Sequence, residues 1–150
     1  MDNYNNFYKE LDTSYAPPAR GHWEPNLKGT GLAPDHITAT NAHYFTIGEM
    51  VFVYAYYSLT EVTDFGTGDY SITLPFTAAY HAELLGGSVQ DTSATKYHTV
   101  KGHIEKDSKE CDLFTIAATA HDEPISHSKP INFTTADVIH ISGWYERRMR

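Results

Sequence analysis

The histidines are the residues of this 150-residue chain that could most directly support chemistry, and there are nine of them. Zinc binds imidazole nitrogen and thiolate sulfur, and it requires three or four such ligands brought together. No two histidines form a His-x-His pair, and Cys111 has no second cysteine beside which it could bind a metal. His81, His98 and His103 could converge only across strands. We therefore expect surface or cross-strand histidines, no metal ion and no other cofactor.

Sequence signatures of other catalytic chemistries do not occur. The chain lacks the short motifs of serine hydrolases, zinc proteases, phosphate-binding loops and dinucleotide-binding folds. The stretch Asp64–Asp69 resembles a calcium loop, but it offers few oxygen ligands and no glutamate follows at the EF-hand spacing. A glycine turn explains the same residues. We therefore predict a protein that is not an enzyme, with a small metal-dependent enzyme as the third-ranked alternative.

Charge and hydropathy exclude further classes of function. The chain has 19 acidic and 11 basic residues, a net charge of −8, and its only basic cluster is the C-terminal tail, residues 147–150. Nucleic-acid binding draws on basic patches, so we expect no nucleic-acid partner. The longest apolar run, Met50–Tyr57, is too short to span a bilayer, and the polar first residues do not resemble a signal peptide. We expect no membrane insertion, and assembly in a cytoplasm.

The elements that must position any site are predicted to be strands. Residues 21–146 show strand-like runs separated by turn signals at short intervals, which predicts one antiparallel β-sandwich domain, jelly-roll-like in class. The clearest strand is Met50–Thr60, which is apolar or aromatic on both faces. Val51, Val53, Ala55, Tyr57 and Leu59 share one face. The other face, with Tyr54 and Tyr56 as candidate partner-binding residues, is expected to be covered by another subunit.

Glycine and proline mark the turns of this predicted domain. Gly66 and Gly68 supply positive-φ positions that lead into a strand over Tyr70–Leu74, and Pro75 ends that strand because it lacks an N–H donor. Gly48 begins a tight turn, and the pair at positions 86 and 87 predicts a β-bulge.

Residues 1–20 differ in composition from the domain. The segment is rich in Asn, Asp and Tyr and ends with a Pro-Pro pair, which favours an extended chain. It is either a leader without fixed structure or an anchoring arm that docks on a neighbouring protein. In the second case the expected anchors are its aromatic residues, Tyr4, Phe7, Tyr8 and Tyr15.

An ordered set of short signatures resembles the β-sandwich domains of tailed-bacteriophage virion proteins, namely tail-fibre or receptor-binding heads and capsid decoration or appendage proteins. The set comprises Trp23-x-Pro25, Tyr44-Phe-Thr-Ile-Gly48, Val51-x-Val53, Gly66-x-Gly68-x-Tyr70-x-Ile-x-Leu74-Pro75-Phe76 and Ile141-Ser-Gly-x-Tyr145. The family pattern has a glycine ahead of Tyr44, where this chain has Asn41-Ala42-His43. The matching residues to which the resemblance assigns structural roles are Trp23, Tyr44, Gly48, Gly66, Gly68, Leu74, Pro75 and Phe76.

The resemblance implies a non-enzymatic virion protein, usually a homotrimer, without cofactor or catalytic residues. A short arm and a single sandwich would suit a capsid-decorating (cement) protein or a compact tail appendage, held to other virion proteins by the arm. The alternative is a receptor-binding head that recognises a host cell-surface glycan, with Tyr56, Tyr57 or Trp144 stacking on sugar rings. In either case the expected location is the virion, assembled in the host cytoplasm.

Overall fold

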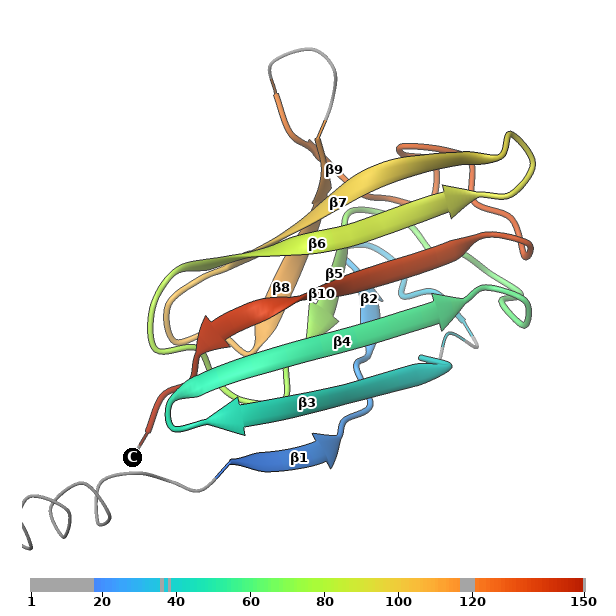
Figure 1. Ribbon diagram of the computed structural model, residues 1–150. Helices are drawn as coiled ribbons and strands as arrows, with labels where there is room; N and C mark the ends of the chain where they lie inside the picture. The colour runs from blue at the N-terminus through green and yellow to red at the C-terminus, as the bar shows by residue number, and fades with distance from the viewer. Residues whose placement is uncertain (1–17, 36, 38, 117–120, 150) are drawn as a thin grey trace, which may run out of the picture.

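The computed structural model describes residues 18–35, 37, 39–116 and 121–149 (Figure 1). These residues form strands and turns and contain no helix, so none of them belongs to a helix able to cross a membrane. The ten strands are β1 (Ala19–His22), β2 (Leu27–Gly29), β3 (Asn41–Ile47), β4 (Met50–Ser58), β5 (Tyr70–Thr73), β6 (Ala82–Asp91), β7 (Lys96–Ile104), β8 (Glu110–Thr115), β9 (Glu123–Pro124) and β10 (Val138–Glu146).

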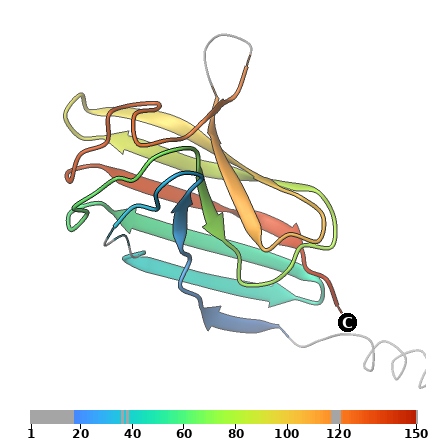
Figure 2. The same ribbon diagram turned by 180° about the vertical axis from the view of Figure 1, so that it is seen from behind.

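All ten strands belong to one antiparallel sheet in the order β1-β3-β4-β10-β6-β7-β8-β5-β2, with β9 paired to β8. The sheet curls into a half-barrel, so that β8, β5 and β2 lie across the inner side of β4 and β10 (Figures 1 and 2). The prediction of an all-β, antiparallel, sandwich-like fold is confirmed. Its two layers are the halves of a single continuous sheet.

The core lies between these two layers and follows the strand period of two. On β4, the inward side chains of Val51, Val53, Ala55 and Tyr57 are all buried. Two tyrosines carry their hydroxyls into the core and find backbone partners in the opposite layer. Tyr57 donates to Pro25 O at 2.8 Å, and Tyr145 donates to Phe76 O at 2.8 Å. A buried hydroxyl needs such a partner, so these bonds join the two layers at defined points.

The predicted glycine turns are present. Gly48, Gly66 and Gly68 have φ angles of 58°, 66° and 85°, in the left-handed region that favours glycine. The strand after the second turn ends at Thr73, and Pro75 follows, as predicted. A register shift between Leu85 and Gly87 confirms the predicted β-bulge in β6.

The ends of the domain differ from the sequence prediction. β1 begins at Ala19, so the last two residues of the predicted arm form part of an edge strand. Arg147 and Arg148, which belong to the basic C-terminal tail expected from the sequence, are held against the domain. The guanidinium of Arg147 lies 5.0 Å from the centre of the Phe76 ring and donates to Gly48 O, while Arg148 pairs with Asp107. The predicted anchors Tyr4, Phe7, Tyr8 and Tyr15 lie outside the described residues.

Candidate functional site

The outer side of β1, β3, β4 and β10 carries a continuous group of rings, which we call the aromatic face. Its members come from alternate positions of the four strands, opposite to the core. The face consists of Arg20, His22, His43, Phe45, Phe52, Tyr54, Tyr56, His140 and Trp144.

Strand register brings these side chains into rows. One row of successive cross-strand partners consists of Arg20, Phe45, Phe52 and Trp144. A second row consists of His22, His43 and Tyr54. The rings of His43 and Tyr54 are stacked with centroids 5.0 Å apart. Such directly opposed pairs on one side of a sheet are the contacts that stabilise it.

Further ring contacts extend this packing in both directions. The Tyr54 ring also lies 5.0 Å from that of His140, and the Phe45 and Phe52 rings are 6.4 Å apart. At the β1 edge, the Arg20 guanidinium lies 5.8 Å from the centre of the Phe45 ring. The rings therefore support one another within the single chain.

The aromatic face is open to solvent in the described part of the chain. Phe52 is 41% exposed and Trp144 is 55% exposed, whereas Tyr57, on the other side of β4, is 0% exposed. Exposed apolar rings gathered on one side of a sheet make the aromatic face the candidate interaction site of the described residues. Tyr54, Tyr56 and Trp144 are thus placed together on the outer side of the sheet. Tyr57 cannot stack on a sugar ring as the sequence analysis proposed, because it lies in the core.

Charge is unevenly distributed over the outer side of the sheet. Among the outward positions of β1, β3, β4 and β10, Glu146 is the one acidic residue, and it lies at the end of β10. Carboxylates gather instead on the outer side of β6, β7 and β8. Because the whole chain has a net charge of −8, two copies that met through the aromatic face would bring few carboxylates together.

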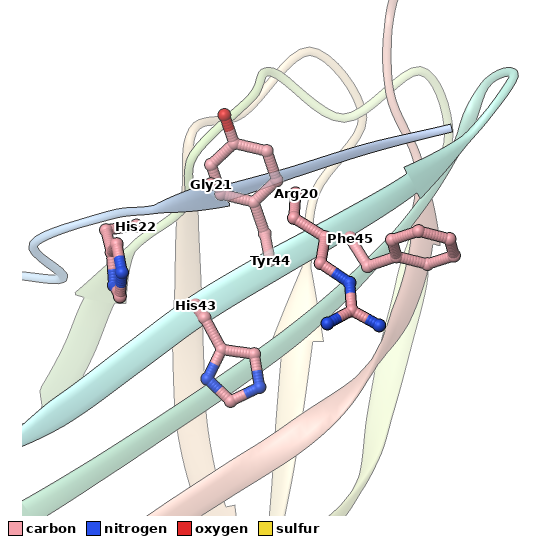
Figure 3. Close-up of a pocket in the computed structure, with 6 residues that line it drawn as sticks. All are labelled: Arg20, Gly21, His22, His43, Tyr44 and Phe45. Atoms are coloured by element: carbon pink, nitrogen blue, oxygen red, sulfur yellow. The ribbon is translucent and has the colours of Figure 1, made fainter. Parts of the chain in front are cut away.

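The β1 edge of the face borders a hollow of about 650 Å³ lined by residues of β1 and β3. Figure 3 shows Arg20 and His43 pointing to one side of these strands and the Tyr44 ring lying on the other. The Tyr44 ring packs over Gly21, where an added Cβ would come within 2.3 Å of it. Glycine at this position lets β1 approach β3 with the ring in place.

His140 is partly buried within the aromatic face. Burial lowers the pKa of His140, and its Nε2 atom is buried without a hydrogen-bond partner among the described residues. Its cross-strand neighbours Tyr56 and Ser88 supply no negative charge. The folded protein therefore binds this proton less readily than the unfolded chain does.

We expect the free energy of unfolding to fall as the pH drops from about 7.5 to about 5, through the ordinary pKa of histidine. Replacing His140 with glutamine should remove part of that decrease, because glutamine does not titrate. Urea unfolding of both proteins at several pH values measures the difference. Equal pH dependence in the two proteins would contradict this role of His140.

The residues that matched the virion-protein pattern lie on the inner side of the sheet and in turns. Trp23 donates its Nε1–H to Thr73 O at 3.0 Å, and the Tyr44 and Phe76 rings meet edge to face at 5.1 Å. One common hollow is lined by five of these residues, Trp23, Tyr44, Leu74, Pro75 and Phe76. The other three, Gly48, Gly66 and Gly68, form turns.

A second group of polar side chains lies on β6 and β7, away from the aromatic face. His81, His103 and Glu105 have ligand atoms that all lie within 4.8 Å of one another. His98 does not join them, because it is five residues from His103 and therefore on the opposite side of β7. Glu105 was not predicted as a ligand from the sequence. The signal that could have identified it is the pairing of β6 with β7, which brings Glu105 opposite His81.

Cys111 is fully buried beside Gly102, and burial raises the pKa of its thiol. A buried thiol that resists ionisation is a poor nucleophile, so Cys111 packs as a small core residue.

Comparisons of the chain with models of protein families, with curated proteins and with solved structures found no match.

Proposed function

We propose that this protein is a non-enzymatic structural component of a bacteriophage virion, a capsid-decorating or compact tail-appendage protein. Its copies associate through the aromatic face, as a homotrimer. The observation that carries the association is the open group of rings on β3, β4 and β10, with Phe52 at 41% and Trp144 at 55% exposure. The assignment to a virion is supported by the ordered signatures between Trp23 and Tyr145.

The composition of the aromatic face suits contact between proteins. Tyr, Trp, Phe and Arg are the residue types enriched in interfaces, and rings that already pack against one another lose little side-chain freedom on binding. A second copy of the chain is the occupant that charge favours, because the face nearly lacks acidic residues while the chain as a whole is acidic. Copies that meet there bury apolar surface and keep their carboxylates apart.

The N-terminal arm supplies the second contact of the proposal, which is attachment to other virion proteins. β1 follows the arm directly and pairs with β3 so that Ala19 lies opposite Thr46. The arm therefore joins the domain at the border of the aromatic face. An arm rooted there can reach a neighbouring protein while the sheet faces a sister copy.

Deletion of residues 1–17 tests the two contacts separately. We expect the intact protein to have the solution mass of three chains of 16.9 kDa each, measured by light scattering. The truncated protein should keep that mass and lose binding to purified virions of the encoding phage. Binding by the truncated protein as strong as that of the intact one would refute the anchoring role of the arm.

A receptor-binding head that recognises a host glycan is the second candidate, favoured by one observation. Trp144 and Phe52 are cross-strand partners, and both rings are exposed on the aromatic face, at 55% and 41%. Adjacent exposed rings can stack on sugar rings. Screening the protein on host cell-surface glycans tests this candidate, and the absence of binding to every glycan would leave the structural role alone.

A further inference from the structure

His81, His103 and Glu105 converge because of the pairing between β6 and β7. Ala82 lies opposite Ile104, which places His81, just before β6, opposite Glu105, just after β7. His103 and Glu105 are two residues apart and therefore point to the same side of the chain. The three side chains thus project together from the outer side of the sheet, with exposed fractions of 65%, 35% and 59%.

The imidazole nitrogens and carboxylate oxygens of the three side chains lie close together around a single small volume. The Glu105 carboxylate lies between the two imidazoles, with Oε2 2.8 Å from His81 Nδ1 and Oε1 2.9 Å from His103 Nε2. One ligand atom from each residue lies within 4.8 Å of the others. Around a tetrahedral ion with metal–ligand bonds of about 2.0–2.2 Å, the ligand atoms lie roughly 3.4 Å apart, so the exposed side chains must rotate to bring the two imidazoles closer together.

The charge around the cluster favours a cation. On the two neighbouring strands, the direct cross-strand partners of His103 are Glu83, which also pairs with Lys101 at 3.2 Å, and Asp112. Carboxylates so close together attract a divalent ion, and its binding relieves their mutual repulsion.

The ligand set selects the class of metal. Two imidazole nitrogens and one carboxylate oxygen suit Zn²⁺, Ni²⁺ and Cu²⁺, whereas Mg²⁺ and Ca²⁺ prefer oxygen ligands alone. We propose that His81, His103 and Glu105 form a surface site for one such transition-metal ion, whose remaining positions are filled by water. The bound ion links the start of β6 to the end of β7. This site is independent of the association proposed above.

Titration of the metal-stripped full-length protein with Ni²⁺ and Zn²⁺, followed by calorimetry, tests the proposal. We expect one saturable site per chain, a higher unfolding temperature with metal, and no comparable effect of Mg²⁺. Replacing His103 or Glu105 with glutamine should weaken binding at least about tenfold, since even changes outside the ligand shell cost about 10–100-fold. Replacing His98, on the same strand but facing the other side, should leave binding unchanged.

Three results would overturn the proposal. The first is the absence of saturable binding of either metal to the wild-type protein. The second is equal binding by the wild-type protein and the His103→Gln variant, which would indicate adventitious contact with other histidines. The third is an equal loss in the His98→Gln variant. Unfolding temperatures without metal show that each variant folds, and the exposure of the cluster makes a large change in them unexpected.

Discussion

Replacing Phe52 with glutamate is expected to convert the proposed homotrimer into single chains. Phe52 lies in the row of rings between Phe45 and Trp144 and is 41% exposed, so the isolated chain can hold a glutamate at this position in contact with water. In an assembly of copies that each carry a net charge of −8, the same carboxylate would be buried against its equivalents. An unpaired buried charge is strongly unfavourable.

We expect association to weaken at least about 100-fold, which corresponds to about 2.8 kcal/mol, because truncation of a central interface residue alone often costs that much. Sedimentation or light scattering over a range of protein concentrations measures the change. The unfolding temperature should change little, since an exposed ring contributes less to folding than a buried one.

Tyr97→Glu is the matched control for this experiment. Tyr97 is 68% exposed and lies on β7, outside the aromatic face, so the variant adds the same charge at another exposed ring. It should assemble as the wild-type protein does. A wild-type protein that remains a single chain at all concentrations would refute the proposal, as would a Phe52→Glu variant that still assembles. Equal dissociation in both variants would indicate a general effect of charge.

The period of two along β4 explains why its two faces could be predicted. Val51, Val53, Ala55 and Tyr57 fall on one side in any regular strand, and all four are buried. Because both sides are apolar, the alternation alone does not tell which side is the core. The structure settles this by placing β5 and β8 across the side that carries Tyr57, which leaves Tyr56 outward.

The composition of the aromatic face depends on strand pairing, which no local pattern encodes. His43 meets Tyr54 because β3 and β4 form a hairpin, and this pair could have been inferred from the turn at Gly48. His140 and Trp144 join through β10, which is far from β4 in the sequence. Tertiary packing determines such long-range partners, so no pattern in the sequence connects Trp144 with Tyr54.

The same reasoning accounts for the C-terminal residues. Three arginines at the end of a chain are typical of a solvated tail, and sequence position alone favours fraying. Arg147 is nevertheless fixed because the Phe76 ring and the Gly48 carbonyl happen to lie within its reach. Only the folded arrangement of three distant segments brings these partners together.

Gly66→Ala should lower the free energy of unfolding by about 2–5 kcal/mol. Of this, about 1–2 kcal/mol comes from placing a residue with a Cβ in the left-handed conformation, and about 1–3 kcal/mol comes from overpacking. At Gly66, with φ of 66°, an added Cβ would lie 2.2 Å from Leu32 O and 2.8 Å from Pro34 N. These are backbone atoms and cannot rotate away. The loop would have to move, which disturbs the bond from Thr67 N–H to Leu32 O. For a chain of this size, the unfolding temperature should fall by roughly 5–15 °C.

Gly48→Ala separates the two contributions to this loss. Gly48 has φ of 58°, nearly that of Gly66, but it lies in the hairpin turn between β3 and β4. The Gly48→Ala substitution should lower the free energy of unfolding only by the conformational contribution, about 1–2 kcal/mol. Thermal and urea unfolding of the two variants beside the wild-type protein measure the difference. If both variants lose the same stability, the close approach of Gly66 to the Leu32–Pro34 backbone does not exist in the folded protein, and the turn that leads into β5 is not braced by that loop.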